Sequence, residues 1–220
     1  MKVVPILIAG LLALALAGGA VFALSGGVPV PAPQGALASE SKGGPAGSMA
    51  APTASPPRAA RTGPVLRLDD AIRELDLIRP SREKFADDFT LALADGTRFR
   101  LSEHRGKAVL VNFWATWCPP CREEMPAMER LYRQHKDRGL VLVAVSVDAD
   151  PAVVTPYLRE NKLSFPVALD PKMDVADTYG VRALPSSFVV DREGRVTVLA
   201  LGPRRWDNDA AHSLVEALTH

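Results

Sequence analysis

Cysteine and histidine are scarce in this sequence of 220 residues, which has two cysteines and four histidines. A structural zinc site needs about four ligands, and neither a second C-x-x-C nor a histidine pair at finger spacing is present. Excess positive charge is also lacking: the formal net charge is +1, and no basic stripe marks a nucleic-acid-binding surface. We therefore expect no metal ion, no cofactor and no nucleic-acid partner.

The two cysteines, Cys118 and Cys121, stand at C-x-x-C spacing where the hydrophobic pattern changes. Residues 108–114 form an apolar run rich in β-branched and aromatic side chains, which predicts a buried strand. Apolar residues then recur every three or four positions from Met125 to Tyr132, which predicts an amphipathic helix. The dithiol therefore lies where a strand ends and a helix begins.

This junction favours a reactive thiol. Pro119 and Pro120 fall at the first helical positions, where a missing backbone N–H costs nothing. The positive end of a helix and its unpaired N–H groups stabilise a thiolate. We expect Cys118 to be the attacking nucleophile and Cys121, one turn further along, to resolve the mixed disulfide.

Two other roles for the cysteine pair compete with redox chemistry. A structural disulfide between residues three apart closes too small a loop to stabilise a fold much through chain entropy. A buried and inert pair is the second alternative. Redox chemistry is the favoured interpretation, because the spacing and the strand-to-helix setting both support it.

Several motifs around this site resemble the thioredoxin superfamily, and most closely its membrane-tethered TlpA/ResA type of thiol-disulfide oxidoreductase. These motifs are residues 111–121 (VNFWATWCPPC), Pro126 and residues 181–186 (VRALPS). The resemblance covers residues 85–218 and implies a redox-active disulfide between the two cysteines.

The resemblance also assigns roles to single residues. It implies that Pro185 is a cis-proline facing the dithiol, that Leu184 pairs with an extended substrate, and that Pro126 kinks the active-site helix. Thioredoxin itself has a buried aspartate in the strand before the active site. This chain has Asn112 at the matching position, as the TlpA/ResA type commonly does. Glu124 could supply a carboxylate for proton transfer, but we expect it to be exposed on the helix surface.

Three tryptophans receive separate predictions. Trp114 lies in the predicted strand and is expected in the core. Trp117 directly precedes Cys118 and is expected on an apolar, substrate-binding rim where a partner protein docks. Trp206 has no neighbouring chemistry and is assigned to packing.

The remaining pattern predicts an α/β fold: a thioredoxin-like sandwich with a mixed central β-sheet, an N-terminal β-hairpin and a central βα insertion. Strands are expected at residues 140–147, 165–169, 187–190 and 196–200, and helices at 65–78, 150–161, 173–179 and 207–218. The hairpin pairs 89–93 with 97–101 across Asp95 and Gly96, and the insertion covers 148–170.

The sequence before this domain has two parts. After Lys2, residues 3–24 contain no charge and are long enough to span a bilayer; we expect an N-terminal membrane anchor over residues 1–24, with a cleaved signal peptide as the alternative. Residues 25–64 are rich in Pro, Ala, Gly and Ser and are predicted to be a disordered linker. The thioredoxin-like domain is expected over 65–220, on the periplasmic or extracytoplasmic face of the membrane.

These observations predict a protein thiol-disulfide oxidoreductase acting on disulfide-containing extracytoplasmic proteins. The resemblance implies a reductant, recharged by a membrane electron donor of the DsbD or CcdA kind, serving cytochrome c maturation (with apocytochrome c as a partner) or copper-site assembly. One alternative is a peroxiredoxin-like peroxidase, which needs an isolated cysteine beside a threonine and an arginine. The other is a Sco-like copper-binding chaperone, a class that carries a C-x-x-x-C motif and a histidine late in the chain.

Overall fold

The computed structural model describes residues 63–220. The predicted anchor over residues 1–24 and nearly all of the predicted linker lie outside the described residues. Within 63–220, no helix combines the length and the apolar character needed to cross a membrane.

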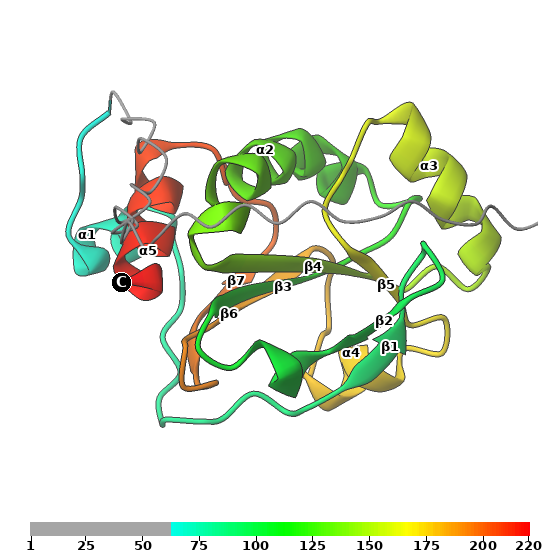
Figure 1. The fold of residues 1–220 in the computed structure, drawn as a ribbon, viewed down its shortest axis with the longest axis horizontal. Coiled ribbons are helices and arrows are strands. Elements are labelled where there is room, and N and C mark those ends of the chain that lie inside the picture. The colour runs from blue at the N-terminus through cyan, green and yellow to red at the C-terminus, as the bar shows by residue number, and fades with distance from the viewer. Residues whose placement is uncertain (1–62) are drawn as a thin grey trace, which may run out of the picture. The chain divides into compact units, whose positions relative to one another are not determined.

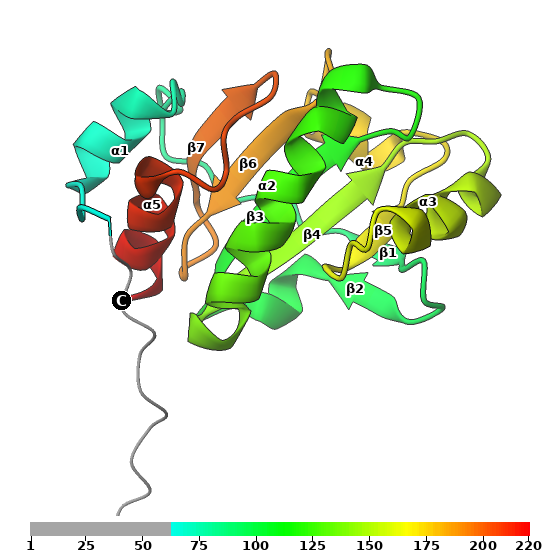
Figure 2. The ribbon, with the colours of Figure 1, turned by 90° about the horizontal axis from the view of Figure 1, so that it is seen from above.

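A mixed five-stranded sheet forms the centre of the domain (Figures 1 and 2), as the sequence predicts. Its strands stand in the order β5-β4-β3-β6-β7. Strands β3, β4 and β5 are parallel, and β6 pairs antiparallel with both of its neighbours, β3 and β7. Their bounds are β3 Ala108–Trp114, β4 Leu140–Ser146, β5 Val167–Leu169, β6 Ser186–Val190 and β7 Val196–Leu201.

Strand β3 occupies the middle of the sheet, and both of its faces are covered by other parts of the domain. All seven of its residues are buried, including the predicted core residue Trp114, which is fully buried. Helices α2 (Pro119–His135) and α3 (Val154–Glu160) lie over one face and α4 (Asp174–Thr178) lies over the other (Figure 1). A continuous apolar strand is what this double coverage requires.

Two further helices, α1 (Leu68–Glu74) and α5 (Asp209–Thr219), pack against each other (Figure 2), and α5 also contacts α2 and β3. The predicted helix over 65–78 therefore packs on the domain, but it is shorter than expected. At Asp76 the backbone turns into the left-handed region, with φ of 50°. Ile78 then pairs with Leu199 of β7, which ends the helical course.

The predicted hairpin and insertion are also present. Strands β1 (Thr90–Ala92) and β2 (Arg98–Arg100) pair antiparallel, and Leu93 forms a bridge to Ala168 of β5. The segment 148–170 supplies α3 and β5, the βα insertion. Short 3₁₀ turns complete the chain at η1 (Leu101–His104), η2 (Lys136–Arg138) and η3 (Pro151–Val153).

Candidate active site

Cys118 and Cys121 are joined by a disulfide at the start of α2. Cys118 is the N-cap of the helix, and Pro119 and Pro120 are its first two residues. Since neither proline carries a backbone N–H, the first available donor is that of Cys121, which lies 3.4 Å from the Cys118 Sγ. The structure thus confirms the predicted setting of the dithiol.

The two sulfurs face different surroundings. Cys118 lines a groove of about 450 Å³ although only 4% of the residue is exposed, whereas Cys121 lines no part of that groove and is fully buried. The groove brings together the predicted substrate-binding residues Trp117 and Leu184. Its other lining residues are Pro119, Pro120, Val147, Met173, Val181, Arg182 and Ala183. Apart from Arg182 this lining is uncharged and largely apolar.

Trp117 is 67% exposed and forms part of the rim of the groove, which agrees with its predicted position. The peptide bond between Leu184 and Pro185 is cis, as the resemblance implies. Pro185 itself is buried directly before β6. Pro126 lies in the interior of α2, which continues to His135.

The prediction that Glu124 is exposed on the helix surface is wrong, because its side chain is buried. Only 3% of the residue is accessible. Its Oε1 accepts a hydrogen bond from Asn112 Nδ2 at 2.8 Å, and its Oε2 accepts from the Arg204 backbone N–H at 3.0 Å. Desolvation raises the pKa of Glu124 to about 7, although these donors oppose the rise. One turn separates Glu124 from Cys121 on the buried face of α2.

Trp206 also departs from the prediction that it serves packing alone. It is buried, and its Nε1 donates to Glu124 Oε2 at 3.2 Å. Asn112 completes the surroundings: its Nδ2 also lies 3.0 Å from Ser187 Oγ, while its Oδ1 has no hydrogen-bond partner. A polar cluster therefore lies behind the buried cysteine.

The sequence did contain a signal for this cluster. Positions 121, 124, 128 and 131 follow helical spacing, so a helix that buries Cys121, Met128 and Leu131 also buries Glu124. The partners of Glu124 could not be read in the same way, because Trp206 lies 82 residues further along the chain.

Asp148 is a second functional candidate that sequence reasoning missed. Its carboxylate is 3% exposed and accepts hydrogen bonds from the Thr116 backbone N–H at 3.0 Å and from the Thr116 Oγ1 at 2.6 Å. Ser146 Oγ donates to the same carboxylate at 2.8 Å. Asp148 thereby attaches the turn before Cys118 to the end of β4. An acidic residue directly after a buried strand was the available signal.

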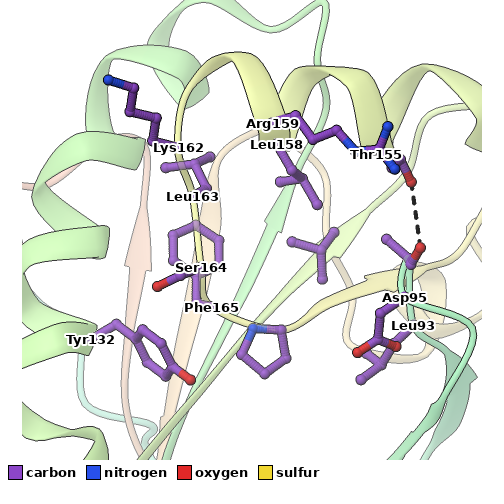
Figure 3. Close-up of a pocket in the computed structure, with 13 residues that line it drawn as sticks. Leu93, Asp95, Tyr132, Thr155, Leu158, Arg159, Lys162, Leu163, Ser164 and Phe165 are labelled. Atoms are coloured by element: carbon purple, nitrogen blue, oxygen red, sulfur yellow. Dashed lines mark hydrogen bonds between the residues drawn. The ribbon is translucent and has the colours of Figure 1, made fainter.

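A larger cavity of about 580 Å³ lies elsewhere, between the β1–β2 turn, α2 and α3. Figure 3 shows its lining side chains, with Leu158 and Arg159 from α3 and Tyr132 from α2. It shares no lining residue with the groove at Cys118. Over residues 63–220, no group of three or more His, Cys, Asp and Glu side chains could hold a metal ion.

The fold and the dithiol at the start of α2 define a thioredoxin-like protein. The chain belongs to the AhpC/TSA family, whose profile matches residues 83–199. Curated relatives confirm the predicted likeness to the ResA type. Thiol-disulfide oxidoreductase ResA of Bacillus anthracis is 38% identical over 119 residues, which make up 54% of this chain and 69% of that protein.

Other relatives agree with this assignment. ResA of Bacillus thuringiensis subsp. konkukian is 39% identical over 113 residues, or 51% of this chain, and the match spans only 65% of that relative's length. Among solved structures, a thiol:disulfide interchange protein of the thioredoxin family from Chlorobium tepidum TLS superposes with a TM-score of 0.57. It is 31% identical and covers 64% of this chain and 99% of its own.

The thioredoxin domain of a thiol-disulfide oxidoreductase from Bacteroides vulgatus superposes with a TM-score of 0.55 at 28% identity. The superposition covers 62% of this chain and 96% of that domain. The likeness to these two structures supports the predicted fold.

Proposed function

We propose that this protein is an extracytoplasmic thiol-disulfide oxidoreductase that reduces disulfides in partner proteins through Cys118 and Cys121. The observation that carries the proposal is the asymmetry of the pair. Cys118 lines an open groove at a helix N-terminus, and Cys121 is buried one turn from Glu124. The names of the relatives support the same reaction class.

In the first step, the Cys118 thiolate of the reduced protein attacks one sulfur of the partner's disulfide. A new bond forms between Cys118 Sγ and that sulfur, the partner's disulfide breaks, and its other sulfur leaves as a thiolate. The positive end of α2 and the Cys121 N–H, 3.4 Å from the Cys118 Sγ, favour the thiolate form of the nucleophile.

In the second step, Cys121 transfers its proton to the Glu124 carboxylate and attacks Cys118 Sγ. The intramolecular disulfide forms, the mixed disulfide breaks, and the partner's second sulfur leaves as a thiolate. Two electrons have then passed from the dithiol to the partner. With a pKa of about 7, Glu124 is divided between its two protonation states near neutral pH, which suits a proton carrier.

The partner's peptide docks in the groove in this scheme. Its extended backbone lies alongside Leu184 and Pro185, and apolar side chains around its cystine contact Trp117. The lining supports this role because nearly all of it is uncharged and it opens directly onto Cys118.

The biological setting follows from the family resemblance. We place the domain on the outer side of the cell membrane, anchored through residues 1–24, where a membrane donor of the DsbD or CcdA kind returns it to the dithiol form. Its clients are then apocytochrome c or proteins with copper sites. The relatives named thiol-disulfide oxidoreductase ResA support the reaction class on which this setting depends.

The equilibrium reduction potential of the Cys118–Cys121 pair tests the direction of electron flow. A value near the thioredoxin end of the scale, roughly −270 mV, is expected for a dedicated reductant. A value near the DsbA end, roughly −120 mV, would show that the protein inserts disulfides instead. Rapid peroxide turnover or a stoichiometric tight copper site in the reduced protein would favour one of the two alternative functions.

A further inference from the structure

The loop between β7 and α5 connects the N-terminal helix to the active site through Arg204. The Arg204 side chain reaches the end of α1, where its Nε donates to the Leu75 carbonyl oxygen at 2.6 Å. Its Nη2 donates to the carbonyl oxygen of Asp76 at 2.8 Å and to the exposed carboxylate of the same residue at 3.1 Å. The side chain is only 15% exposed, so these contacts fix it firmly against the helix.

The same guanidinium also holds its own loop. Its Nη1 lies within hydrogen-bond distance of the carbonyl oxygens of Leu201, Gly202 and Pro203, at 3.1, 3.3 and 3.0 Å. A cation at the carbonyl end of a helix is favourable, because those carbonyls carry partial negative charge and lack helical partners. The side chain therefore fastens the loop to α1.

This loop supplies two of the three donors that the structure shows on Glu124. The Arg204 backbone N–H and the Trp206 indole N–H both donate to Oε2, and Asn112 donates to Oε1. The Arg204 guanidinium is also the charged group whose electrostatic effect lowers the pKa of Glu124. If the loop shifted, the buried carboxylate would lose most of the groups that stabilise its ionised form.

We propose that Arg204 is a positioning residue for the redox reaction, and that by binding the end of α1 it holds the loop donors on the Glu124 carboxylate beside Cys121. Helix α1 is then part of the redox machinery although it contributes no side chain to the groove. The inference rests on the proposed function, because it assumes that Glu124 accepts the Cys121 proton.

The test separates the two chemical steps in the full-length reduced protein. The disulfide reagent DTNB releases one coloured thionitrobenzoate when Cys118 attacks it, and a second when Cys121 resolves the mixed disulfide. In the wild-type protein the second step should depend on pH with an apparent pKa of about 7, the value for Glu124.

Arg204→Met should raise that apparent pKa, because the ionised carboxylate loses donors and a nearby cation. If the pKa rises from about 7 to about 8, the ionised fraction at pH 7 falls from about one half to about one tenth, and the second step slows roughly fivefold. The first step should be unchanged. Arg205→Met is the matched control, since that neighbouring side chain is exposed.

Arg204→Lys keeps the charge but cannot donate to several carbonyls at once, so it should shift the second-step pKa in the same direction by a smaller amount. If Arg204→Met does not fold, Arg204→Lys alone tests whether Arg204 holds the donors on Glu124. An unchanged second-step pH profile in a folded Arg204 variant overturns the inference. A wild-type protein that releases no second thionitrobenzoate would instead contradict the proposed function.

Discussion

The two cysteines stand three residues apart, yet the regions around them are opposite in character. On the Cys118 side lies an open groove with a mainly apolar lining, and its rim residue Trp117 is 67% exposed. On the Cys121 side lies a closed and polar cluster of Glu124, Asn112 and Trp206. In the mechanism that we propose, the first region gives a protein substrate access to the Cys118 sulfur, and the second supplies the buried Glu124 carboxylate as the proton acceptor for Cys121.

In the proposed mechanism, this difference lets one turn of helix serve two chemical steps. Attack on a partner needs a thiolate that the partner can reach, which the helix N-terminus and the groove provide. Resolution needs a base of suitable strength, and the raised pKa of Glu124, about 7, fits the role that we propose for it. Each variant below alters either the region around Cys118 or the region around Cys121.

The largest effect is expected from the cysteines themselves. Cys118→Ser should abolish exchange, because no thiolate then faces the groove. Cys121→Ser should still attack a client disulfide but should accumulate the mixed disulfide, since nothing resolves it. Trapping with a disulfide-containing peptide, followed by non-reducing electrophoresis, measures both. Trapping by Cys118→Ser but not by Cys121→Ser would reverse the assigned roles.

Glu124→Gln tests the buried side through stability. In the wild-type protein, burial raises the pKa of Glu124 from its ordinary value of 4.5 to about 7, so the native state binds more protons than the unfolded state between these two pH values. The contribution of this group to stability is therefore fully present below about pH 4.5 and is lost as pH rises through about 7. Since one pKa unit corresponds to about 1.36 kcal/mol, the loss amounts to about 3 kcal/mol.

The glutamine variant should lack this loss, and its amide can donate to the unpartnered Asn112 Oδ1 if the asparagine amide rotates. Urea unfolding of the oxidised proteins at pH 5 and pH 8 measures the difference, with the exposed Glu123→Gln as the control. Glutamine should also slow the resolving step, because it cannot accept a proton. Parallel pH profiles of stability for wild type and Glu124→Gln would contradict the assigned pKa.

The groove at Cys118 could largely be predicted from the sequence, whereas the polar cluster behind Cys121 largely could not. Local patterns define β3 and the start of α2, because apolar periodicity and proline positions act over a few residues, whereas the motif around Leu184 was found through the family resemblance. Strand β4 runs from Leu140 to Ser146, within one residue of its prediction. The position of Trp117 directly before Cys118 placed it on the rim.

The polar contacts could not be predicted, because they join residues far apart in the chain. Trp206 donates to a carboxylate 82 residues away, and Thr116 to one 32 residues away. Buried polar groups are satisfied by whichever partner the tertiary fold brings near, and no local pattern names that partner. The early end of α1 has a similar origin, since the pairing of Ile78 with Leu199 competes with the helix.

Asp148→Asn should weaken the support of the turn that presents Cys118 to the groove. Its carboxylate accepts from Thr116 and Ser146, and asparagine retains one acceptor oxygen while losing the charge. Because hydrogen bonds to charged groups contribute roughly 1.5–3 kcal/mol, we expect a loss of about 1–2 kcal/mol in unfolding free energy. Slower first-step exchange with DTNB should accompany it. Asp150 is exposed, and asparagine at this position can still cap η3. Asp150→Asn should therefore change neither the unfolding free energy nor the first-step rate. Equal losses of unfolding free energy in both variants would contradict a special role for Asp148.

The smallest effect is expected from Trp117→Ala, which removes an apolar contact from the rim and leaves both sulfurs and the buried cluster in place. Aromatic residues at an interface often contribute about 1 kcal/mol or more, so KM for a protein disulfide should rise roughly fivefold while kcat changes little. Exchange with DTNB should be nearly unaffected, because a small reagent does not need the rim. Phe85→Ala is the matched control, since Phe85 is 63% exposed and does not line the groove. An equal rise in KM for both variants would show that client proteins do not dock at Trp117.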